Sequence, residues 1–141
     1  MDFRELAAAV TNELAQVFQK MDDSSVKPFT DALTRVHERG GRVFAHACGR
    51  EGISLRPFVM RLAHMGFAAH WAFDDTATGC ARGDIYVTSV GSGSIDNSLY
   101  YHAERAKDAG ARVALLTAAP DSAFAAFADI VVYIPAAAWR L

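Results

Sequence analysis

Five short apolar segments, separated by stretches with helical spacing, constrain the fold of this chain more than any other feature. Gly49, Gly66, Gly83 and Gly91 lie at the ends of these segments. Strands with apolar residues on both faces are typical of a parallel sheet that is covered by helices on each side. We therefore predict an α/β fold, a single doubly wound domain with a five-stranded parallel sheet. The predicted strands are RVFAHAC (42–48), FAAHWAF (67–73), DIYVTSV (84–90), RVALLTAA (112–119) and DIVVYIPA (129–136).

The first forty residues have the spacing of two amphipathic helices. Between Asp2 and about Met21 apolar residues recur every three or four positions, and the same spacing returns over 26–36. The polar residues 22–25 can cap the second helix, which we expect to end at a pair of glycines. A chain of 141 residues is long enough for one core but too short for two ordinary domains. We predict an N-terminal helical hairpin over 1–40, an α/β core over 42–136, and one domain over 1–141.

Composition and charge exclude several classes of protein. The net charge is −2 and no basic run is long enough to follow a phosphate backbone, so we expect no nucleic acid partner. No segment has the pattern of a signal peptide or the apolar length of a membrane span, so we expect a cytoplasmic protein without a membrane partner. Cys48 and Cys80 form no CxxC unit, and no Cys/His spacing resembles a metal site. We therefore expect no metal and no cofactor.

Two turns rich in glycine and short polar side chains follow predicted strands. The first turn is ACGREG at 47–52 and the second turn is GSGSIDN at 91–97. In open α/β sheets, ligands bind beyond the carboxyl ends of the strands, where these turns are expected to lie. Backbone N–H groups, hydroxyls and the positive end of the following helix dipole can converge there on an anion. The second turn fits a phosphate, and a tight turn with a serine as helix cap explains the same residues equally well.

Eight residues in the segment from Arg42 to Phe67 have the spacing of a known motif, and they are Gly49, Arg50, Gly52, Met60, Arg61, Leu62, His64 and Gly66. This segment resembles the first motif of the 6-phospho-3-hexuloisomerases, a branch of the sugar isomerase (SIS) proteins, in which a strand precedes G-x-G-R-S-G, a helix and M-R-L-x-H-x-G. The second turn resembles the family's S-x-S-G-[E/R]-T loop, and DIVVYIP resembles its last strand. The resemblance covers about residues 25–136 and implies an SIS domain with a flavodoxin-like fold.

The resemblance also implies a binding site for a phosphorylated sugar. Asp75 and Thr76, after the second predicted strand, are expected either to bind sugar hydroxyls or to belong to a solvated loop. Isomerisation of a sugar phosphate through an enediol requires a base and a group that polarises the carbonyl. His64 is the first candidate catalytic residue and His46 the second, although histidines at such positions are also typical of packed or interface sites. The predicted phosphate-binding residues are Gly49, Arg50, Glu51, Ser92, Gly93, Ser94 and Asn97.

Several departures from the family pattern fall on these functional positions. Glu51 replaces a serine and brings an anion close to the expected phosphate. Ile95 replaces a glycine, and Asn97 replaces a threonine while keeping a hydrogen-bond donor. A glutamate that family members carry on a further helix, and that is thought to transfer the proton, has no counterpart in this sequence.

Two classes of function therefore remain open. The first is a phosphosugar isomerase-like protein that binds a ketohexose phosphate, and the second is a non-catalytic sugar-phosphate-binding module or sensor. A third hypothesis, prompted by Glu51, is a site for an amino or neutral sugar. The N-terminal helices of SIS proteins pack against other subunits, so the resemblance implies a homodimer or homotetramer.

Overall fold

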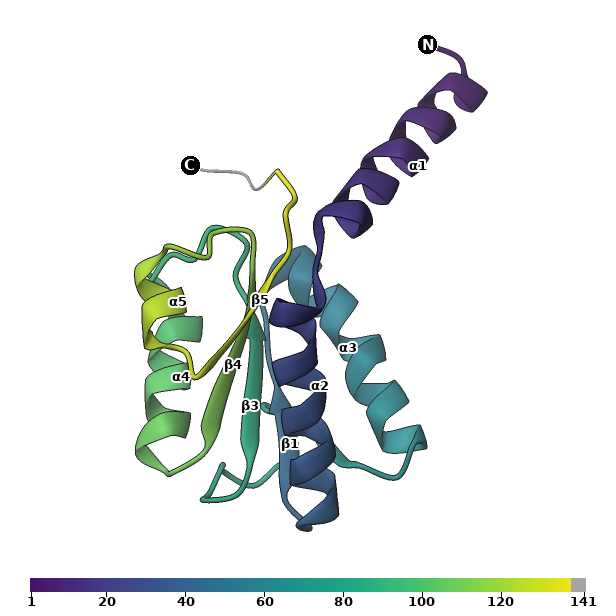
Figure 1. Cartoon of the computed structure of the whole chain (residues 1–141). Coiled ribbons are helices and arrows are strands. Elements are labelled where there is room, and N and C mark those ends of the chain that lie inside the picture. Colours follow the sequence, from purple (N-terminus) through teal and green to yellow (C-terminus); the bar gives the residue numbers. More distant parts are fainter. Residues whose placement is uncertain (138–141) are drawn as a thin grey trace.

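The computed structural model describes residues 1–137 and has an open sheet with helices on both faces (Figure 1). All five predicted strands form, but each is shorter than predicted because the apolar runs continue into the adjoining turns. The elements are α1 (Phe3–Lys20), α2 (Asp23–Glu38), β1 (Arg42–Ala45), α3 (Gly49–His64), β2 (Ala68–Trp71), β3 (Ile85–Ser89), α4 (Ser98–Asp108), β4 (Arg112–Thr117), α5 (Ala123–Phe127) and β5 (Ile130–Tyr133).

The sheet is entirely parallel, in the order β2-β1-β3-β4-β5. This order confirms the predicted five-stranded, doubly wound, flavodoxin-like arrangement. From β1 the chain moves outward to β2 and then crosses back to β3, which pairs with the other side of β1. The strand order therefore reverses between β1 and β3, and the carboxyl ends of these two strands form the crevice where ligands bind in such folds.

Two hydrophobic clusters pack on opposite faces of the sheet. One lies beneath α2 and α3 and includes Phe29, Leu33, Leu55 and Leu62, whereas the other lies beneath α4 and α5. Figure 1 shows the same division, with α2 and α3 on one side of the strands and α4 and α5 on the other. The central strands are buried on both faces, which explains their continuous apolar sequences.

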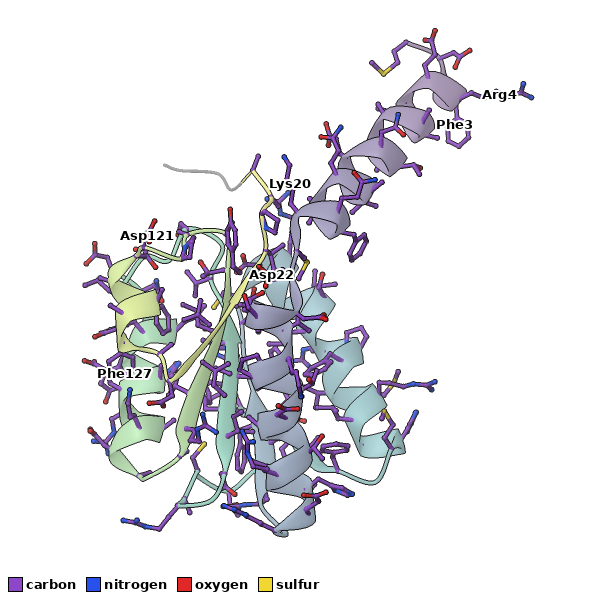
Figure 2. All side chains as sticks on the ribbon, viewed as in Figure 1. Phe3, Arg4, Lys20, Asp22, Asp121 and Phe127 are labelled. Atoms are coloured by element: carbon purple, nitrogen blue, oxygen red, sulfur yellow. The ribbon has the colours of Figure 1, made fainter. Side chains whose placement is uncertain are left out.

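The two predicted N-terminal helices are present, but the predicted hairpin is wrong. Helix α1 does not fold back on α2; it projects away from the sheet and buries none of its residues (Figure 1). Its apolar side chains are exposed, and Phe3 lies at its far end beside Arg4 (Figure 2). The reason is local, because Met21 and Asp22 both have extended backbones and therefore do not reverse the direction of the chain.

Helix α5 lies between β4 and β5, in a stretch without a helical apolar pattern. It has only five residues, and the Ser122 side chain caps it by accepting a hydrogen bond from the Ala125 N–H at 3.2 Å. A helix this short has no room for the apolar repeat that reveals longer helices. Its position matters for the site because Ser122 packs directly against Gly93 of the second turn.

Candidate functional site

The first turn is shaped by glycine and places two charged side chains at the crevice. Gly49 has a φ of +55°, and a Cβ at Gly52 would collide with the backbone carbonyl of Ala47. Glycine is therefore required at Gly52 by close backbone approach and favoured at Gly49 by the left-handed conformation. The turn lets α3 begin directly after β1, so Arg50 and Glu51 lie in the first helical turn at the carboxyl edge of the sheet.

The second turn is held by hydrogen bonds among its own residues. The Ser92 hydroxyl accepts from the Ser94 N–H at 3.4 Å, and the Ser94 hydroxyl accepts from the Asp96 N–H at 3.2 Å. Asn97 donates from its side-chain amide to the Ser94 carbonyl at 2.6 Å and caps α4 by accepting from the Tyr100 N–H at 3.1 Å. The helix cap is therefore Asn97 rather than a serine.

Glu51 joins the two turns. Its Oε1 atom accepts a hydrogen bond from the backbone N–H of Gly91 at 2.8 Å, and its side chain is half-buried. Arg50 is exposed, and no carboxylate in the described part of the chain lies within ion-pair distance of it. The crevice thus has one oriented carboxylate and one unpaired guanidinium side by side.

Two adjoining cavities open at this point, and together they form the cleft. Their volumes are about 450 Å³ and 360 Å³, and both are lined by Arg50, Glu51, Ser89, Leu116 and Ile134. The first cavity has an apolar end, formed by Phe29, Leu55 and Phe58, whereas the second adds Gly91, Ser92 and Thr117. The cleft therefore offers hydroxyls and backbone groups at one end and apolar side chains at the other.

Of the predicted site residues, only Arg50, Glu51 and Ser92 line the two cavities of the cleft. The remaining predicted residues of the two turns do not line these cavities, and they are Gly49, Gly93, Ser94 and Asn97.

Three further predicted residues lie outside both turns. His64 is the exposed last residue of α3, and at about 1.5 Å per residue it lies roughly 20 Å along the helix from Arg50. Asp75 and Thr76 are exposed in the loop after the edge strand β2 and line neither cavity of the cleft. Within one chain, the structure brings together the residues of the two turns but not these three.

A second polar cluster at the same edge of the sheet contains His46 and His102. Their rings lie 5.7 Å apart, and each contacts Phe73, at 4.4 Å and 4.6 Å between centroids. The Nδ1 atoms of both histidines are buried without a hydrogen-bond partner among the described residues. Burial lowers the pKa of both side chains, and for His46 the charges of His102 and Arg56 lower it further.

Strand alternation in the sequence is a signal for this cluster. His46 comes two residues after Phe44 in the extended chain, so its side chain points to the same face of the sheet, the one that α4 covers. The cluster therefore lies across the sheet from the apolar end of the cleft, which is formed by residues of α2 and α3.

The described residues contain no group of three or more metal-ligating side chains, and no helix among them is long and apolar enough to cross a membrane.

Comparison with known proteins identifies relatives in sequence and structure, although no family model matches the chain. The chain is 40% identical over 131 residues to a 3-hexulose-6-phosphate isomerase of Mycobacterium gastri, which covers 91% of this chain and 65% of that protein. It is 31% identical over 135 residues to a 3-hexulose-6-phosphate isomerase of Bacillus subtilis strain 168, which covers 96% of this chain and 70% of that protein. This chain therefore spans only about two thirds of the length of these relatives.

Solved structures share the fold at lower identity. A Methanococcus jannaschii protein, whose structure was used to infer a 3-hexulose-6-phosphate isomerase function, has a TM-score of 0.77 at 22% identity and covers 98% of this chain and 76% of that one. The Vibrio vulnificus NanR protein, complexed with ManNAc-6P, has a TM-score of 0.76 at 18% identity and covers 94% of this chain and 51% of that one. The resemblance identified in the sequence is thus confirmed, and the chain belongs to the 3-hexulose-6-phosphate isomerase family of SIS proteins.

Proposed function

We propose that this protein is a phosphosugar isomerase that binds a ketohexose phosphate in the cleft and converts it through an enediol. The observation that carries the proposal is the junction of the two turns, where Arg50 and Ser92 line the cleft and the hydrogen bond between Glu51 and Gly91 fixes their relative position. The names of the Mycobacterium gastri and Bacillus subtilis relatives support hex-3-ulose 6-phosphate as the substrate.

The phosphate is assigned to the second turn and the beginning of α4. The Ser92 and Ser94 hydroxyls accept backbone N–H bonds and donate to no other described residue, so their protons are free for an anion. Asn97 uses its side-chain oxygen as a helix cap and retains one amide proton. The N-terminus of α4 adds its dipole, and Arg50 supplies the positive charge across the cleft.

The remaining parts of the proposal rest on the resemblance. We take residues 1–141 as one cytoplasmic SIS domain that forms a homodimer or homotetramer. The exposed apolar residues of α1 support an oligomer, since the helix has no apolar contact of its own to bury them. His64, Asp75 and Thr76 can act at a cleft only if another subunit brings them there, because within one chain they lie away from it.

A panel of ligands and one pair of substitutions test the proposal. Sugar phosphates should raise the melting temperature whereas their unphosphorylated parents should not, because a ligand that binds only the native state stabilises it by mass action. Isomerisation of hex-3-ulose 6-phosphate to fructose 6-phosphate should be lost in Ser92→Ala/Ser94→Ala and kept in Thr11→Ala, an exposed hydroxyl on α1. Equal stabilisation by the parent sugars, with no turnover at high enzyme concentration, would refute the proposal.

A second candidate is a sugar-phosphate-binding module without catalysis. It is favoured by one observation, that the Glu51 carboxylate already occupies the Gly91 N–H, a donor that an anionic ligand could otherwise use. The fold is compatible with it, since the structural neighbour NanR is complexed with ManNAc-6P. This candidate predicts saturable binding without turnover, so any turnover that depends on the second turn would eliminate it.

A further inference from the structure

Four buried polar atoms of the described chain have no hydrogen-bond partner within it, and they are His46 Nδ1, the Tyr86 hydroxyl, the Thr88 hydroxyl and His102 Nδ1. Thr88 is completely buried, and Tyr86 is 2% exposed. Buried polar groups in folded proteins are nearly always hydrogen-bonded, because an unpaired group loses its bonds to solvent without replacement. Four such atoms in one small domain therefore require an explanation. We refer to these four side chains as the buried polar cluster.

The topology brings the buried polar cluster together on the face of the sheet that α4 covers (Figure 1). Tyr86 packs in the hydrophobic cluster beneath α4, and Thr88, two residues further along β3, points to the same face. The parallel register of β1 and β3 continues through the hydrogen bond from the His46 N–H to the Val87 carbonyl at 3.1 Å, which places His46 beside Thr88. His102 reaches them from α4, with its ring centroid 5.7 Å from that of His46.

The buried polar cluster offers both hydrogen-bond donors and acceptors. Burial, followed by the charges of Cys80 and Cys48, raises the pKa of Tyr86 above its ordinary value, so its hydroxyl keeps its proton and can donate. Burial lowers the pKa of His46 and His102, so at neutral pH each imidazole is neutral, with one donor and one acceptor. A water molecule both donates and accepts, and an internal water typically binds about three buried polar groups. The chemistry of the cluster therefore fits bound water.

We propose that bound water lies between β1, β3 and α4 and joins the buried polar cluster in one hydrogen-bond network. The four atoms are buried by elements of this chain itself, so the inference does not depend on any segment or subunit that covers the molecule from outside. It is also independent of the proposed isomerase function. The network ties His46, just before the first turn, to His102, in the helix that follows the second turn. The bound water therefore stabilises the relative position of the two turns that form the cleft.

The test replaces the threonine hydroxyl by a methyl group of similar size in Thr88→Val. Where the hydroxyl is bonded to internal water, its loss breaks the network, and we expect the melting temperature to fall by about 3–5 °C. An unpaired hydroxyl predicts the opposite sign, since valine would then remove a buried group that costs stability. The matched control is Thr117→Val, a buried threonine on β4 whose hydroxyl bonds the Gly91 carbonyl at 3.3 Å and the Ala119 N–H at 3.1 Å. It should lower the melting temperature by a similar amount.

Tyr86→Phe removes only a hydroxyl from the same cluster and gives an independent measurement if Thr88→Val does not fold. It should also lower the melting temperature, and the loss in Tyr86→Phe/Thr88→Val should be smaller than the sum of the single losses, because the two hydroxyls share the water. A high-resolution crystal structure of the unaltered protein should show an ordered water oxygen within about 3.2 Å of at least three of the four atoms. A higher or unchanged melting temperature in either single variant, strictly additive losses, or direct hydrogen bonds among the four side chains without water would overturn the proposal.

Discussion

The first turn and the second turn lie next to each other at the carboxyl edge of the sheet and each begins a helix, but they are stabilised differently. In the first turn Cys48 precedes α3 without a side-chain cap, and the glycine backbone packs closely on itself. In the second turn the polar side chains bond one another and Asn97 caps α4. The first turn therefore leaves the Arg50 side chain free to bind a ligand. In the second turn, most of the polar side chains already make hydrogen bonds within the turn or to the start of α4.

The largest change in the free energy of unfolding should come from adding a side chain where the backbone of the first turn is closely packed. In Gly52→Ala the new Cβ would collide with the Ala47 carbonyl, a backbone atom that cannot turn aside, and we expect a loss of about 3 kcal/mol or more in the free energy of unfolding. Urea denaturation measures this loss. The matched control is Gly49→Ala, where the Cβ would enter open space and only the positive φ is penalised, by about 1 kcal/mol. Equal costs at the two glycines would show that backbone packing does not define this turn.

A substitution at Gly93 in the second turn should cost less unfolding free energy than the substitution at Gly52, because the obstacle at Gly93 is a side chain. Gly93→Ala combines a φ of +65° with a collision against the Ser122 side chain, and we expect a loss of about 2 kcal/mol. Since the obstacle is a side chain, Gly93→Ala/Ser122→Gly should recover part of the loss. A double-mutant cycle on unfolding free energies measures the coupling. An absence of coupling would mean that Ser122 does not limit the space at Gly93.

The caps of the two helices should respond with opposite signs. Asn97→Ala removes the acceptor for the Tyr100 N–H and should destabilise the protein by about 1 kcal/mol. Cys48→Ser introduces a hydroxyl at an uncapped position with extended backbone, and should stabilise the protein by a few tenths to about 1 kcal/mol. Thermal unfolding followed by circular dichroism detects both changes. A destabilising Cys48→Ser would show that the thiol has a packing role that the cap does not replace.

The sequence could predict most of this architecture, because its signals are local. Apolar runs closed by glycine located the strands and both turns, and the motif around Arg50 and Glu51 located the cleft. The sequence could not predict the direction in which α1 leaves α2, or which residues far apart in the chain contact one another. The direction of α1 depends on two extended residues at Met21 and Asp22, and the apolar spacing of α1 is the same whether or not it packs.

Local sequence patterns also could not predict which residues lie close together in the folded chain. His64 matches its motif, but the motif helix runs away from the cleft, so its first turn reaches the site and its last residue does not. The hydrogen bond from Gly91 to Glu51 joins residues forty positions apart, and no spacing rule anticipates it. The contact between His46 and His102 was partly predictable, since strand alternation places His46 on the same face as Phe44.

The contact between His46 and His102 is a second link between the turns, and its effect on stability should depend on pH. His46 lies just before the first turn, and His102 lies in the helix that follows the second turn. The pKa of each is lowered in the folded protein, so between these lowered values and the ordinary histidine value of 6.5 the unfolded chain binds more protons than the folded one. Stability should therefore be complete above this range and fall as pH decreases through it, by up to about 1.4 kcal/mol per pH unit for each group.

Urea denaturation between pH 5 and 8 measures this slope. His46→Leu should flatten it, since it removes one of the two histidines whose pKa is lowered by burial. The matched control is His64→Asn, which alters an exposed histidine at the far end of α3, away from both turns. A slope that stays the same in His46→Leu would mean that the link on this face of the sheet is apolar packing around Phe73. In that case the link on the cleft side, the hydrogen bond from the Gly91 N–H to the Glu51 carboxylate, would be the one of these two links that involves a charged group.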